Sequence, residues 1–517
     1  MQRYKILWAD DEIELLKPHI LFLTEKDCDI TAVNSGVEAL EKIQKDDFDL
    51  VFLDESMPGL SGLETLGEIQ KIKPNTPVVM ITKNEEEQIM EEAIGSKISD
   101  YLIKPINPKQ ILLSIKKLLD NKRLVSEKTN SNYQKEFQQI SMTYNDIITY
   151  EEWIDVYKKL VYHEIGIDST EHKSMKEVLE MQKSEANVNF SKFITRNYED
   201  WLHDDNFDKP LLSHELLSER VFPLVQGGEK VFFILIDNLR FDQWKVFEPI
   251  INTYFKTTIE DAYFSILPTT TQYARNAIFA GMLPLEISKK LPKYWSNEDE
   301  EGGKNNYEKE LIGENLKANK LNINYSYHKI LNPETGNAVV DNLSNLLHND
   351  LNVIVYNFVD MLSHARTDIA VIKELAKDEA AYRTLAKSWL EHSPFLDLLR
   401  KLKDHKVKVV ITTDHGTVRV KKPVKIVGDR NTNTNLRYKT GRNLSYDAKA
   451  VFTMKDPESF GLPKRNVSSS YVFATEDDYF VYPNNYNQYV RAYGDTFQHG
   501  GISMEEVIIP FIELLPR

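Results

Sequence analysis

The chain has 517 residues, a formal net charge of -15 at pH 7, and a hydrophobic content of 41%. This length exceeds what a single hydrophobic core usually holds, so we expect two or three domains. The negative charge argues against a general affinity for duplex nucleic acid, because the phosphates would be repelled.

Cysteine content and hydropathy indicate the compartment. The single cysteine, Cys28, excludes an internal disulfide and is consistent with a reducing environment. No apolar run is long enough to cross a membrane, and the N-terminal sequence lacks a signal-peptide pattern. We therefore expect a cytoplasmic protein with no membrane partner.

Residues 1–120 are predicted to form a doubly wound α/β domain, because short apolar segments alternate with helical patterns. The predicted strands are residues 4–9, 50–53, 78–82 and 101–103. The predicted helices between them include residues 36–44 and 63–71.

Residues 121–205 are predicted to form a helical linker domain. Strand patterns disappear from residue 121 to about residue 225. An apolar face repeats there at helical spacing and comprises Trp153, Val156, Tyr157, Leu160 and Val161. Aromatic stripes of this kind belong to a core far more often than to a cofactor site. We therefore expect a helical bundle or connector.

Residues 206–517 are predicted to form a second α/β domain. Gly227 and Gly228 interrupt the chain before a new β-rich start. Apolar runs then recur among helices, and they read VFFILID, NVIVYNFVD and VKVVITTDH. Runs without polar alternation suit strands that are buried on both faces of a parallel sheet.

Acidic residues end two of the first predicted strands. Asp10 and Asp11 follow the strand at residues 4–9, and Asp54 comes at the end of the strand at residues 50–53. Because parallel strands end at one edge of a sheet, these carboxylates should gather there and favour Mg²⁺. Thr82 and Lys104 end the next two strands, which adds a hydroxyl and a positive charge. Together, these groups could hold Mg²⁺ and support a carboxylate that accepts a phosphoryl group.

These residues resemble the CheY-like receiver domains over the first 120 residues. The match includes Asp10-Asp11, the run LDESMPGLSG around Asp54, Thr82, and the run DYLIKP that contains Lys104. The resemblance implies that Asp54 is the phosphoacceptor. It implies that Asp11, Asp54 and the carbonyl group of Ser56 hold Mg²⁺ with help from Asp10. It also implies that Thr82 and Tyr101 form the switch pair that reports phosphorylation.

A second group of potential ligands combines carboxylates with imidazoles. Asp237, Asp360 and Asp414 each end a buried-type strand run, so they should meet at one sheet edge. The histidines are His364, one helical turn after Asp360, His415, which follows Asp414, and His499, which precedes two glycines. Mixed ligands of this kind suit Zn²⁺, with Mn²⁺ next, and six ligands fit two neighbouring metals.

A candidate nucleophile lies in the run PTTTQYARNAIFAG, residues 268–281. Three threonines precede a helix-forming stretch, so one hydroxyl could lie at a helix N-terminus, where phosphate groups bind readily. A threonine hydroxyl becomes a useful nucleophile when metal coordination lowers its pKa. An N-capping threonine is the structural alternative.

Together, these motifs resemble the alkaline phosphatase superfamily, and its PglZ branch in particular, across residues 205–517. The resemblance implies one metal site from Asp237, Thr271, Asp414 and His415, and another from Asp360, His364 and His499. A Pro-Thr-x-Thr pattern selects Thr271 as the catalytic nucleophile. Related diesterases bind the phosphate with an asparagine three residues later. Ala274 occupies that position here, so Arg275 or Asn276 is the expected replacement.

The whole chain resembles the PorX-type response regulators of Bacteroidetes, which combine a receiver, a helical linker and a PglZ domain. This resemblance implies control of type IX secretion, a sensor histidine kinase as partner, and a sigma factor downstream. It also favours cleavage of phosphodiesters in nucleotides or oligonucleotides. Because the altered face of a phosphorylated receiver commonly self-associates, we expect a homodimer on phosphorylation of Asp54.

Two functions remain open on the sequence. The first is a zinc-dependent phosphodiesterase controlled by phosphorylation. The second is a signalling adaptor for a sigma factor or another transcription partner, in which the phosphatase-like site is structural or secondary. An adaptor needs neither a nucleophile nor six metal ligands, so the enzyme is favoured. A DNA-binding regulator finds no support, because no helix-turn-helix with a basic recognition helix follows residue 120.

One basic segment, residues 416–442, runs against the acidic average. It could guide an oligonucleotide to the metals, or it could be a solvated β-hairpin. Its basic residues are Arg419, Lys421, Lys422, Lys425, Arg430, Arg437, Lys439 and Arg442.

Overall fold

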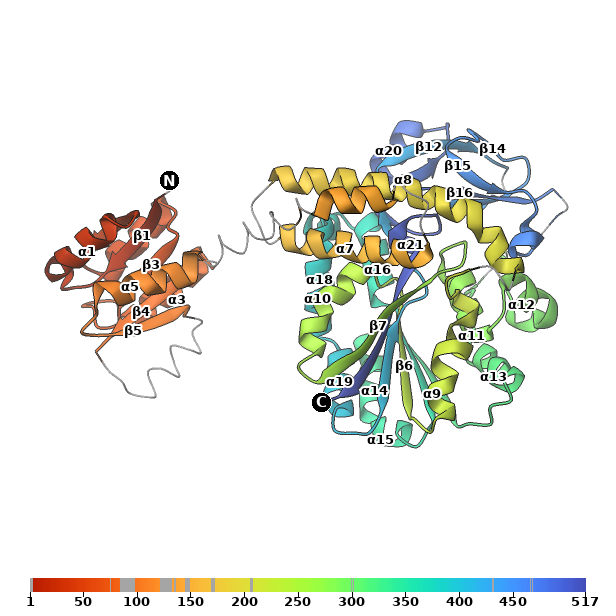
Figure 1. Ribbon diagram of the computed structural model, residues 1–517, viewed down its shortest axis with the longest axis horizontal. Helices are drawn as coiled ribbons and strands as arrows, with labels where there is room; N and C mark the ends of the chain where they lie inside the picture. Colours follow the sequence, from red (N-terminus) through yellow and green to blue (C-terminus); the bar gives the residue numbers. More distant parts are fainter. Residues whose placement is uncertain are drawn as a thin grey trace. The chain divides into compact units, whose positions relative to one another are not determined.

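The computed structural model describes residues 3–74, 76–83, 98–120, 133, 136–144, 149–168, 173–204, 208–298, 300, 302–429, 432–464, 466 and 468–517. The chain divides into two compact units, Met1–Asn132 and Tyr133–Arg517 (Figure 1). Each unit has its own sheet and its own hydrophobic core, so each is described by itself.

The first unit is a five-stranded parallel sheet in the order β2-β1-β3-β4-β5. Its strands are β1 (Tyr4–Ala9), β2 (Cys28–Val33), β3 (Leu50–Asp54), β4 (Val78–Thr82) and β5 (Asp100–Ile103). Its helices include α1 (Lys17–Thr24), α2 (Gly36–Lys45), α3 (Gly62–Ile72) and α5 (Pro108–Ile115). The four predicted strands and both predicted helices are confirmed to within a residue or two. Strand β2 was not predicted, because it lies at the sheet edge, where its four inner residues are exposed or only partly buried.

The pleat of these strands explains why helices cover both faces of this sheet. Ile6 and Trp8 of β1 belong to one hydrophobic cluster, which also contains Ile111 of α5. Leu7 and Ala9 belong to the other cluster, with residues of α2 and α3. Alternate residues along a strand point to opposite faces, so both faces of a doubly wound sheet are buried.

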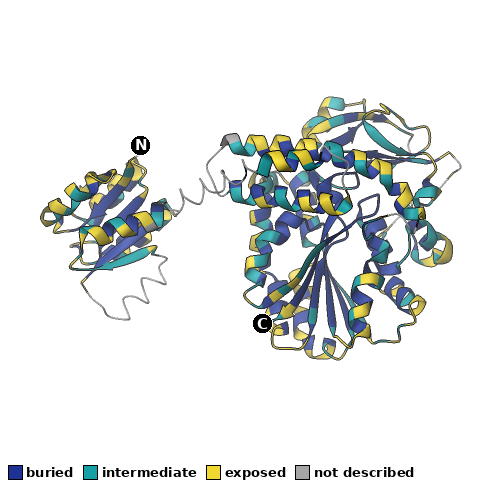
Figure 2. Cartoon of the chain, in the orientation of Figure 1, coloured by how far each residue is buried: buried dark blue, intermediate teal, exposed yellow. Residues whose placement is uncertain are grey.

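The second unit is built on a six-stranded mixed sheet in the order β7-β19-β10-β6-β9-β8. Strands β10, β6, β9 and β8 are parallel to one another, and β19 runs antiparallel to both of its neighbours, β10 and β7. The strands are β6 (Val231–Ile236), β7 (Phe255–Phe264), β8 (Tyr325–Ile330), β9 (Leu351–Tyr356), β10 (Lys408–Thr412) and β19 (Ile508–Pro516). Strands β6 and β9 are buried along their whole length, as their unbroken apolar runs predict (Figure 2).

The rest of the described part of this unit consists of helices and of smaller, separate sheets. The helices are α9 (Phe222–Gln226), α10 (Phe241–Ile251), α11 (Asn276–Ala280), α12 (Pro284–Lys290), α13 (Glu308–Ala318), α14 (Pro333–Asp341), α15 (Leu343–Leu346), α16 (Phe358–Asp368), α17 (Ala370–Leu375), α18 (Glu379–Glu391), α19 (Pro394–Leu402), α20 (Tyr486–Tyr493) and α21 (Met504–Val507). The smaller strands are β11 (Val418–Arg419), β12 (Lys422–Val427), β13 (Tyr438–Gly441), β14 (Ser445–Tyr446), β15 (Val451–Met454), β16 (Ser470–Ala474), β17 (Asp478–Val481) and β18 (Phe497–Gln498).

Two long helices, α7 (Tyr150–Asp168) and α8 (Lys173–His203), occupy the region predicted to be a linker. They share one hydrophobic core with the large sheet. Phe190 and Trp201 of α8 both lie edge-on to Phe264 of β7, with ring centroids 5.9 Å and 5.8 Å apart. These helices are therefore packed on the second unit as part of it.

Candidate metal centres

The acidic pocket of the first unit lies where β1 and β3 end. Asp10 and Asp54 are buried, and Lys104 Nζ lies 2.9 Å from Asp10 Oδ2 and 3.0 Å from Asp54 Oδ1. Burial raises the pKa of Asp54, and the charge of Asp10 adds to this rise. Burial opposes the charged form of Lys104, but the two carboxylates outweigh it and raise the pKa of the amine. The predicted lysine and carboxylates therefore meet at one sheet edge.

The remaining predicted residues lie around the same edge. Asp11 is exposed, and one of its ligand atoms lies within 4.8 Å of ligand atoms of Asp10 and Asp54. Thr82, at the end of β4, donates a hydrogen bond from its hydroxyl to Glu55. Tyr101 lies on the neighbouring β5. The three carboxylates suit Mg²⁺. That the carbonyl group of Ser56 is a further ligand of this ion stays a prediction.

In the second unit, the predicted ligands converge at the ends of the central strands. Asp237 directly follows β6, and Asp414 comes two residues after β10. Asp360 does not end a strand, contrary to the prediction, because β9 stops at Tyr356 and α16 begins at Phe358. Asp360 therefore lies in the first turn of α16. His364 follows one turn later on the same helix, as predicted.

The first ligand group surrounds the hydroxyl of Thr271. His415 Nε2 lies 3.1 Å from Thr271 Oγ1 and 3.7 Å from Asp237 Oδ1. The hydroxyl also lies 3.5 Å from Asp237 Oδ1, and Asp414 Oδ2 lies 3.9 Å from His415 Nε2. Asp237, Asp414 and His415 are buried. All of these donor atoms face the same small volume.

Thr271 begins a helical segment, residues 271–275, which continues into α11. Thr270 is the N-cap residue of this segment, and its side chain makes no capping hydrogen bond. The hydroxyl that was predicted at a helix start is therefore that of Thr271. The structural alternative, an N-capping threonine, is not observed, because the N-cap residue Thr270 makes no capping hydrogen bond.

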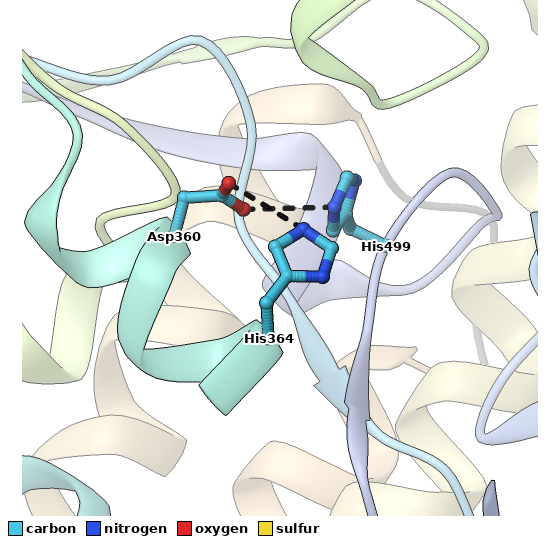
Figure 3. Close-up of side chains that lie close together, drawn as sticks. All are labelled: Asp360, His364 and His499. Carbon is cyan, nitrogen blue, oxygen red and sulfur yellow. Dashed lines mark ion pairs between the residues drawn. The ribbon is translucent and has the colours of Figure 1, made fainter. Parts of the chain in front are cut away.

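The second ligand group consists of Asp360, His364 and His499 (Figure 3). His364 Nε2 lies 3.5 Å from Asp360 Oδ2, and His499 Nε2 lies 3.7 Å from Asp360 Oδ1. The side chain of His364 is 63% exposed, so this group opens to solvent on one side. Burial lowers the pKa of His499 well below its ordinary value, and the neighbouring imidazoles His415 and His364 lower it further. The neutral ring that a metal requires is thus favoured.

Backbone carbonyl groups orient two of the imidazoles. His415 Nδ1 lies 3.1 Å from the carbonyl oxygen of Gly416, and His499 Nδ1 lies 3.3 Å from that of Thr269. Because a carbonyl oxygen only accepts, each Nδ1 carries a proton, and each Nε2 faces the space that it shares with the carboxylates, where a metal could bind. In each group of three residues, one ligand atom per residue lies within 4.8 Å of the others. These donor sets fit two neighbouring Zn²⁺ ions.

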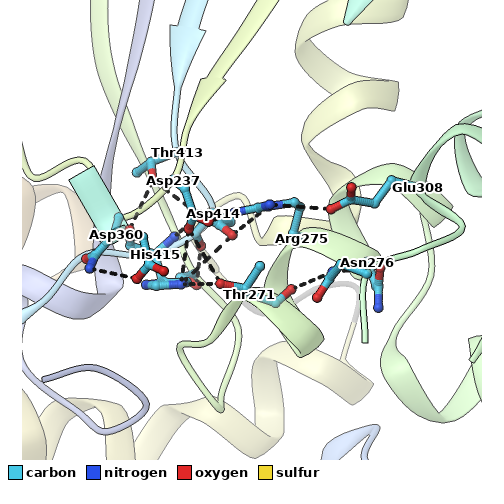
Figure 4. Close-up of polar contacts among 12 residues, drawn as sticks. Asp237, Thr271, Arg275, Asn276, Glu308, Asp360, Thr413, Asp414 and His415 are labelled. Atoms are coloured by element: carbon cyan, nitrogen blue, oxygen red, sulfur yellow. Dashed lines mark hydrogen bonds and ion pairs between the residues drawn. The ribbon is translucent and has the colours of Figure 1, made fainter. Parts of the chain in front are cut away.

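Arg275 lies among carboxylates and is within contact distance of Asp414 and Glu308 (Figure 4). Its guanidinium is fully buried, donates from Nε to Asp414 Oδ2 at 2.9 Å, and pairs with Asp237 and Glu308. Burial alone would raise the pKa of Asp414, but Arg275 and His415 lower it to about 2. For Asp237, burial prevails over Arg275, so its pKa is raised well above the ordinary value.

The other predicted phosphate-binding residue, Asn276, is engaged by a neighbouring loop. Its amide donates to the carbonyl oxygen of Lys304 at 3.2 Å and accepts from Asn305 at 2.9 Å. Asn305 also donates to the carbonyl oxygen of Thr271 at 3.0 Å. Phosphate binding by Arg275 or Asn276 therefore stays a prediction, and the contacts of both residues indicate a supporting role instead.

Sequence reasoning missed residues that support the ligands. Asn238 has a left-handed backbone (φ 65°), and its amide donates to Asp360 Oδ1 at 3.3 Å. The hydroxyl of Thr413 accepts from Leu239 N–H at 3.0 Å and donates to the carbonyl oxygen of His415 at 3.0 Å. Both residues directly adjoin a predicted ligand, Asp237 or Asp414, and this adjacency is the signal that could have found them.

The basic segment, residues 416–442, is not a continuous positive surface. Arg437 is buried and pairs with Glu506, and Lys439 is buried over the ring of Tyr482. Arg419 and Lys422 pair with Asp495 and Asp478. Arg430 lies outside the described residues. The segment forms β11, β12 and β13 of separate small sheets, so the β-hairpin interpretation also fails.

Comparison with protein-family models divides the chain into three parts. Residues 6–116 match the response regulator receiver domain, and residues 123–202 match the PorX response regulator linker domain. Residues 216–514 match the BREX system PglZ alkaline phosphatase-like domain. This last match covers more than half of the chain.

Curated relatives match the receiver part. The transcriptional regulatory protein CpxR homolog of Haemophilus influenzae is 38% identical over 117 residues, which are 22% of this chain and 50% of that protein. The transcriptional regulatory protein ResD of Bacillus subtilis is 33% identical over 115 residues, which are 22% of this chain and 48% of that protein. The chain thus spans about half the length of the curated relatives it matches.

Solved structures match the same part. A CheY-like response regulator receiver domain protein from Methanospirillum hungatei is 26% identical, with a TM-score of 0.23, and the match covers 23% of this chain and 96% of that chain. The chemotaxis protein CheY4 of Vibrio cholerae is 27% identical, with a TM-score of 0.22, and the match covers 23% of this chain and 99% of that chain.

Among the described residues, no helix combines the length and the apolar character that a membrane crossing requires. The order of the three family matches is receiver, PorX linker and PglZ domain, as the sequence motifs predicted. The chain therefore belongs to the PglZ alkaline phosphatase-like family, and it has the architecture of the PorX-type response regulators.

Proposed function

We propose that this protein is a response regulator whose output is a zinc-dependent phosphodiesterase acting on nucleotides or oligonucleotides. In this proposal, a sensor histidine kinase in the cytoplasm leads to phosphorylation of Asp54, with Mg²⁺ held by the receiver carboxylates. A link to type IX secretion, and a sigma factor as downstream partner, belong to the same proposal through the PorX-type architecture.

The observation that carries the proposal is the position of the Thr271 hydroxyl. It lies 3.1 Å from His415 Nε2 and 3.5 Å from Asp237 Oδ1, among buried residues that could hold a metal. Since His415 Nδ1 lies against the Gly416 carbonyl, Nε2 is left for the metal ion that would lie beside the hydroxyl. A structural threonine would need none of these neighbours.

The groups of the chain suggest covalent catalysis. The Thr271 oxygen loses its proton and attacks the phosphorus atom, the bond to one alkoxide breaks, and that alkoxide takes up a proton and leaves as an alcohol. The other ester group stays on the phosphorus, so the intermediate is a phosphodiester to threonine. Water then attacks that phosphorus atom, the bond to Thr271 breaks, and a phosphomonoester leaves as the threonine oxygen regains a proton. Bound Zn²⁺ would supply positive charge to lower the pKa of the nucleophile and to neutralise phosphate oxygens. Asp237, Asp414 and His415 would hold one ion, and Asp360, His364 and His499 the other.

In this proposal, Arg275 positions ligands and does not bind the substrate. Its guanidinium contacts Asp237 and Asp414, which follow β6 and β10 and are predicted ligands of the same metal. Glu308 holds its other side and is itself paired with Lys329 at 2.9 Å. A fixed planar cation of this kind keeps two buried carboxylates at a defined spacing.

The test combines elemental analysis with turnover of chromogenic phosphomonoester and phosphodiester reporters by the full-length protein. We expect up to two zinc ions per chain, and turnover that favours the diester and disappears with a chelator. Zinc-loaded protein that hydrolyses neither reporter nor a short oligonucleotide would contradict the enzyme and favour the adaptor. Turnover of the monoester alone would overturn the assignment as a diesterase.

A further inference from the structure

Helix α8 (Lys173–His203) presents one polar stripe to the segments that carry the candidate catalytic residues. The stripe consists of Lys183, Asn187, Ser191 and Tyr198, whose spacings of four, four and seven residues place them on one face of a helix. Asn187, Ser191 and Tyr198 are buried. Buried polar groups in a helix interface need partners, and these partners are informative.

The first partner is the segment that follows His499. Asn187 accepts from Met504 N–H at 2.8 Å and donates to Glu505 Oε2 at 3.0 Å. Ser191 donates from its hydroxyl to the carbonyl oxygen of Ile502 at 3.3 Å. One side of α8 thus holds residues 502–505, which begin three residues after a predicted metal ligand.

The second partner is the segment that precedes Thr271. Leu267 N–H donates to the hydroxyl oxygen of Tyr198 at 2.9 Å. Leu267 lies four residues before the candidate nucleophile, and Tyr198 is two turns of α8 beyond Ser191. The same helix face therefore reaches both the nucleophile segment and the His499 segment.

Thr269 joins these two segments to each other. Its hydroxyl donates to the carbonyl oxygen of Gly501 at 3.0 Å and accepts from Gly500 N–H at 3.0 Å. Its carbonyl oxygen lies 3.3 Å from His499 Nδ1. Gly500 has φ 120°, and a Cβ atom there would come within 2.7 Å of the Tyr438 ring. A displacement of either segment would therefore move both Thr271 and His499.

We propose that α8 is a positioning element of the catalytic site, in which Asn187 sets the place of His499 and Tyr198 sets the place of Thr271. The proposal rests on the function proposed above. Helix α8 lies in the part of the chain that matches the PorX linker, outside the PglZ match. The region that matches a linker would thus determine whether Thr271 and His499 are correctly placed relative to each other.

The contacts allow a specific rescue. Asn187→Asp keeps the acceptor for Met504 N–H, removes the donor to Glu505, and places two carboxylates against each other. Glu505→Gln in the same chain supplies a new donor for that aspartate and removes the repulsion. Tyr198→Phe removes only the hydroxyl that Leu267 N–H uses, with little change of volume. Arg196→Gln, at an exposed position of α8, is the control.

The experiment measures zinc affinity by chelator competition, and kcat and KM on a diester reporter, for each full-length variant. We expect Asn187→Asp to lower the binding affinity for one of the two zinc ions by about tenfold or more, because loss of a residue that supports a metal ligand typically has an effect of this size. The double variant should recover most of that loss. Tyr198→Phe should lower kcat by about tenfold, with KM and zinc content unchanged, and Arg196→Gln should match the wild type.

The proposal would be overturned if Asn187→Asp and Tyr198→Phe lower only the thermal stability, with wild-type zinc affinity and kcat in the folded protein. It would also be overturned if the double variant recovers nothing. A wild type that holds two zinc ions but lacks turnover would refute the proposed function alone. The zinc affinity of Asn187→Asp would then still show whether α8 positions the metal ligands.

Discussion

The imidazole rings of His415 and His499 are stacked, with centroids 4.3 Å apart and planes inclined by 17°. Each ring belongs to a different group of candidate ligands, so the stack places the two groups side by side. Each ring also turns its Nε2 towards a carboxylate, Asp237 or Asp360. Two stacked imidazoles that turn Nε2 towards different carboxylates are compatible with two neighbouring cations, which is the basis of the metal predictions below.

Removal of the more exposed ligand group should cost one metal. The double variant Asp360→Ala, His364→Ala lacks two of three ligands of that group, so we expect elemental analysis to show one zinc ion fewer per chain. His392→Ala, which changes an exposed histidine that contacts the carbonyl group of Ser388, should keep the wild-type stoichiometry. An unchanged metal content in the double variant would refute this ligand assignment.

Loss of the Thr271 hydroxyl should stop turnover and leave the metal in place. We expect Thr271→Ala to lower kcat on the diester reporter on the order of a thousandfold or more. Thr270→Val is the matched control, because within the described residues the Thr270 hydroxyl has no hydrogen-bond partner. Comparable turnover in both variants would show that Thr271 is not the nucleophile.

Replacement of Arg275 should make folding depend on metal. Arg275→Met leaves Asp237, Asp414 and Glu308 buried without their shared cation, a change that typically costs about 3–5 kcal/mol. Thermal unfolding should therefore show a large loss of stability without zinc, and a partial recovery with zinc, which supplies a replacement charge. The exposed Arg400→Gln is the control. Equal stability of Arg275→Met and wild type in a chelator would contradict this role.

Phosphorylation at Asp54 should change the oligomeric state. A phosphoryl group adds about two negative charges, which should draw Lys104 from its present contacts with Asp10 and Asp54. The hydroxyl of Thr82, which donates to Glu55, should then turn towards the new oxygens. Light scattering with a phosphoryl mimic should show a dimer for wild type and a monomer for Asp54→Ala. Dimerisation of both proteins, or of neither, would contradict this switch.

Stability should vary with pH through Asp478. Burial raises the pKa of this carboxyl from 3.8 to about 6, so the folded state binds its proton more tightly than the unfolded state. Its contribution to stability is therefore full below pH 3.8, declines as the pH rises from 3.8, and is lost once the pH has passed about 6. Asp478→Asn should stabilise the protein at about pH 7.5 on the order of 2 kcal/mol, about half as much at about pH 5, and very little below about pH 3. Thermal unfolding at these pH values tests this, and a gain that is equal at all of them would refute it.

The positions of Asp237 and Asp414 could be predicted because each follows an apolar run that is recognisable as a buried strand. Asp360 was placed at a strand end wrongly, since the run NVIVYNFVD continues in apolar residues after the backbone has become helical at Phe358. Hydropathy does not distinguish these conformations over so few residues. Asp360 nevertheless lies close to His364 and His499, because a strand end and the first turn of the following helix lie at the same sheet edge.

The role of Arg275 could not be predicted, because its partners Asp237, Glu308 and Asp414 are distant in sequence. The same holds for α8, because its polar residues are hydrogen-bonded to Leu267 and Met504, which are distant from them in sequence. The spacing of Asn187, Ser191 and Tyr198 was nevertheless visible as polar positions on a helix face. The basic segment, residues 416–442, does not form the basic surface that was considered, because Arg437 and Lys439 are buried by contacts that composition does not reveal.

The most direct test of a covalent mechanism at Thr271 is rapid quenching of diester turnover by zinc-loaded protein, followed by peptide mapping. We expect a phosphodiester adduct on Thr271, which keeps one ester group of the reporter, forms and decays within the turnover time, and is absent from Thr271→Ala. Full turnover by Thr271→Ala, or an adduct on Thr269 or Thr270 instead, would contradict the account.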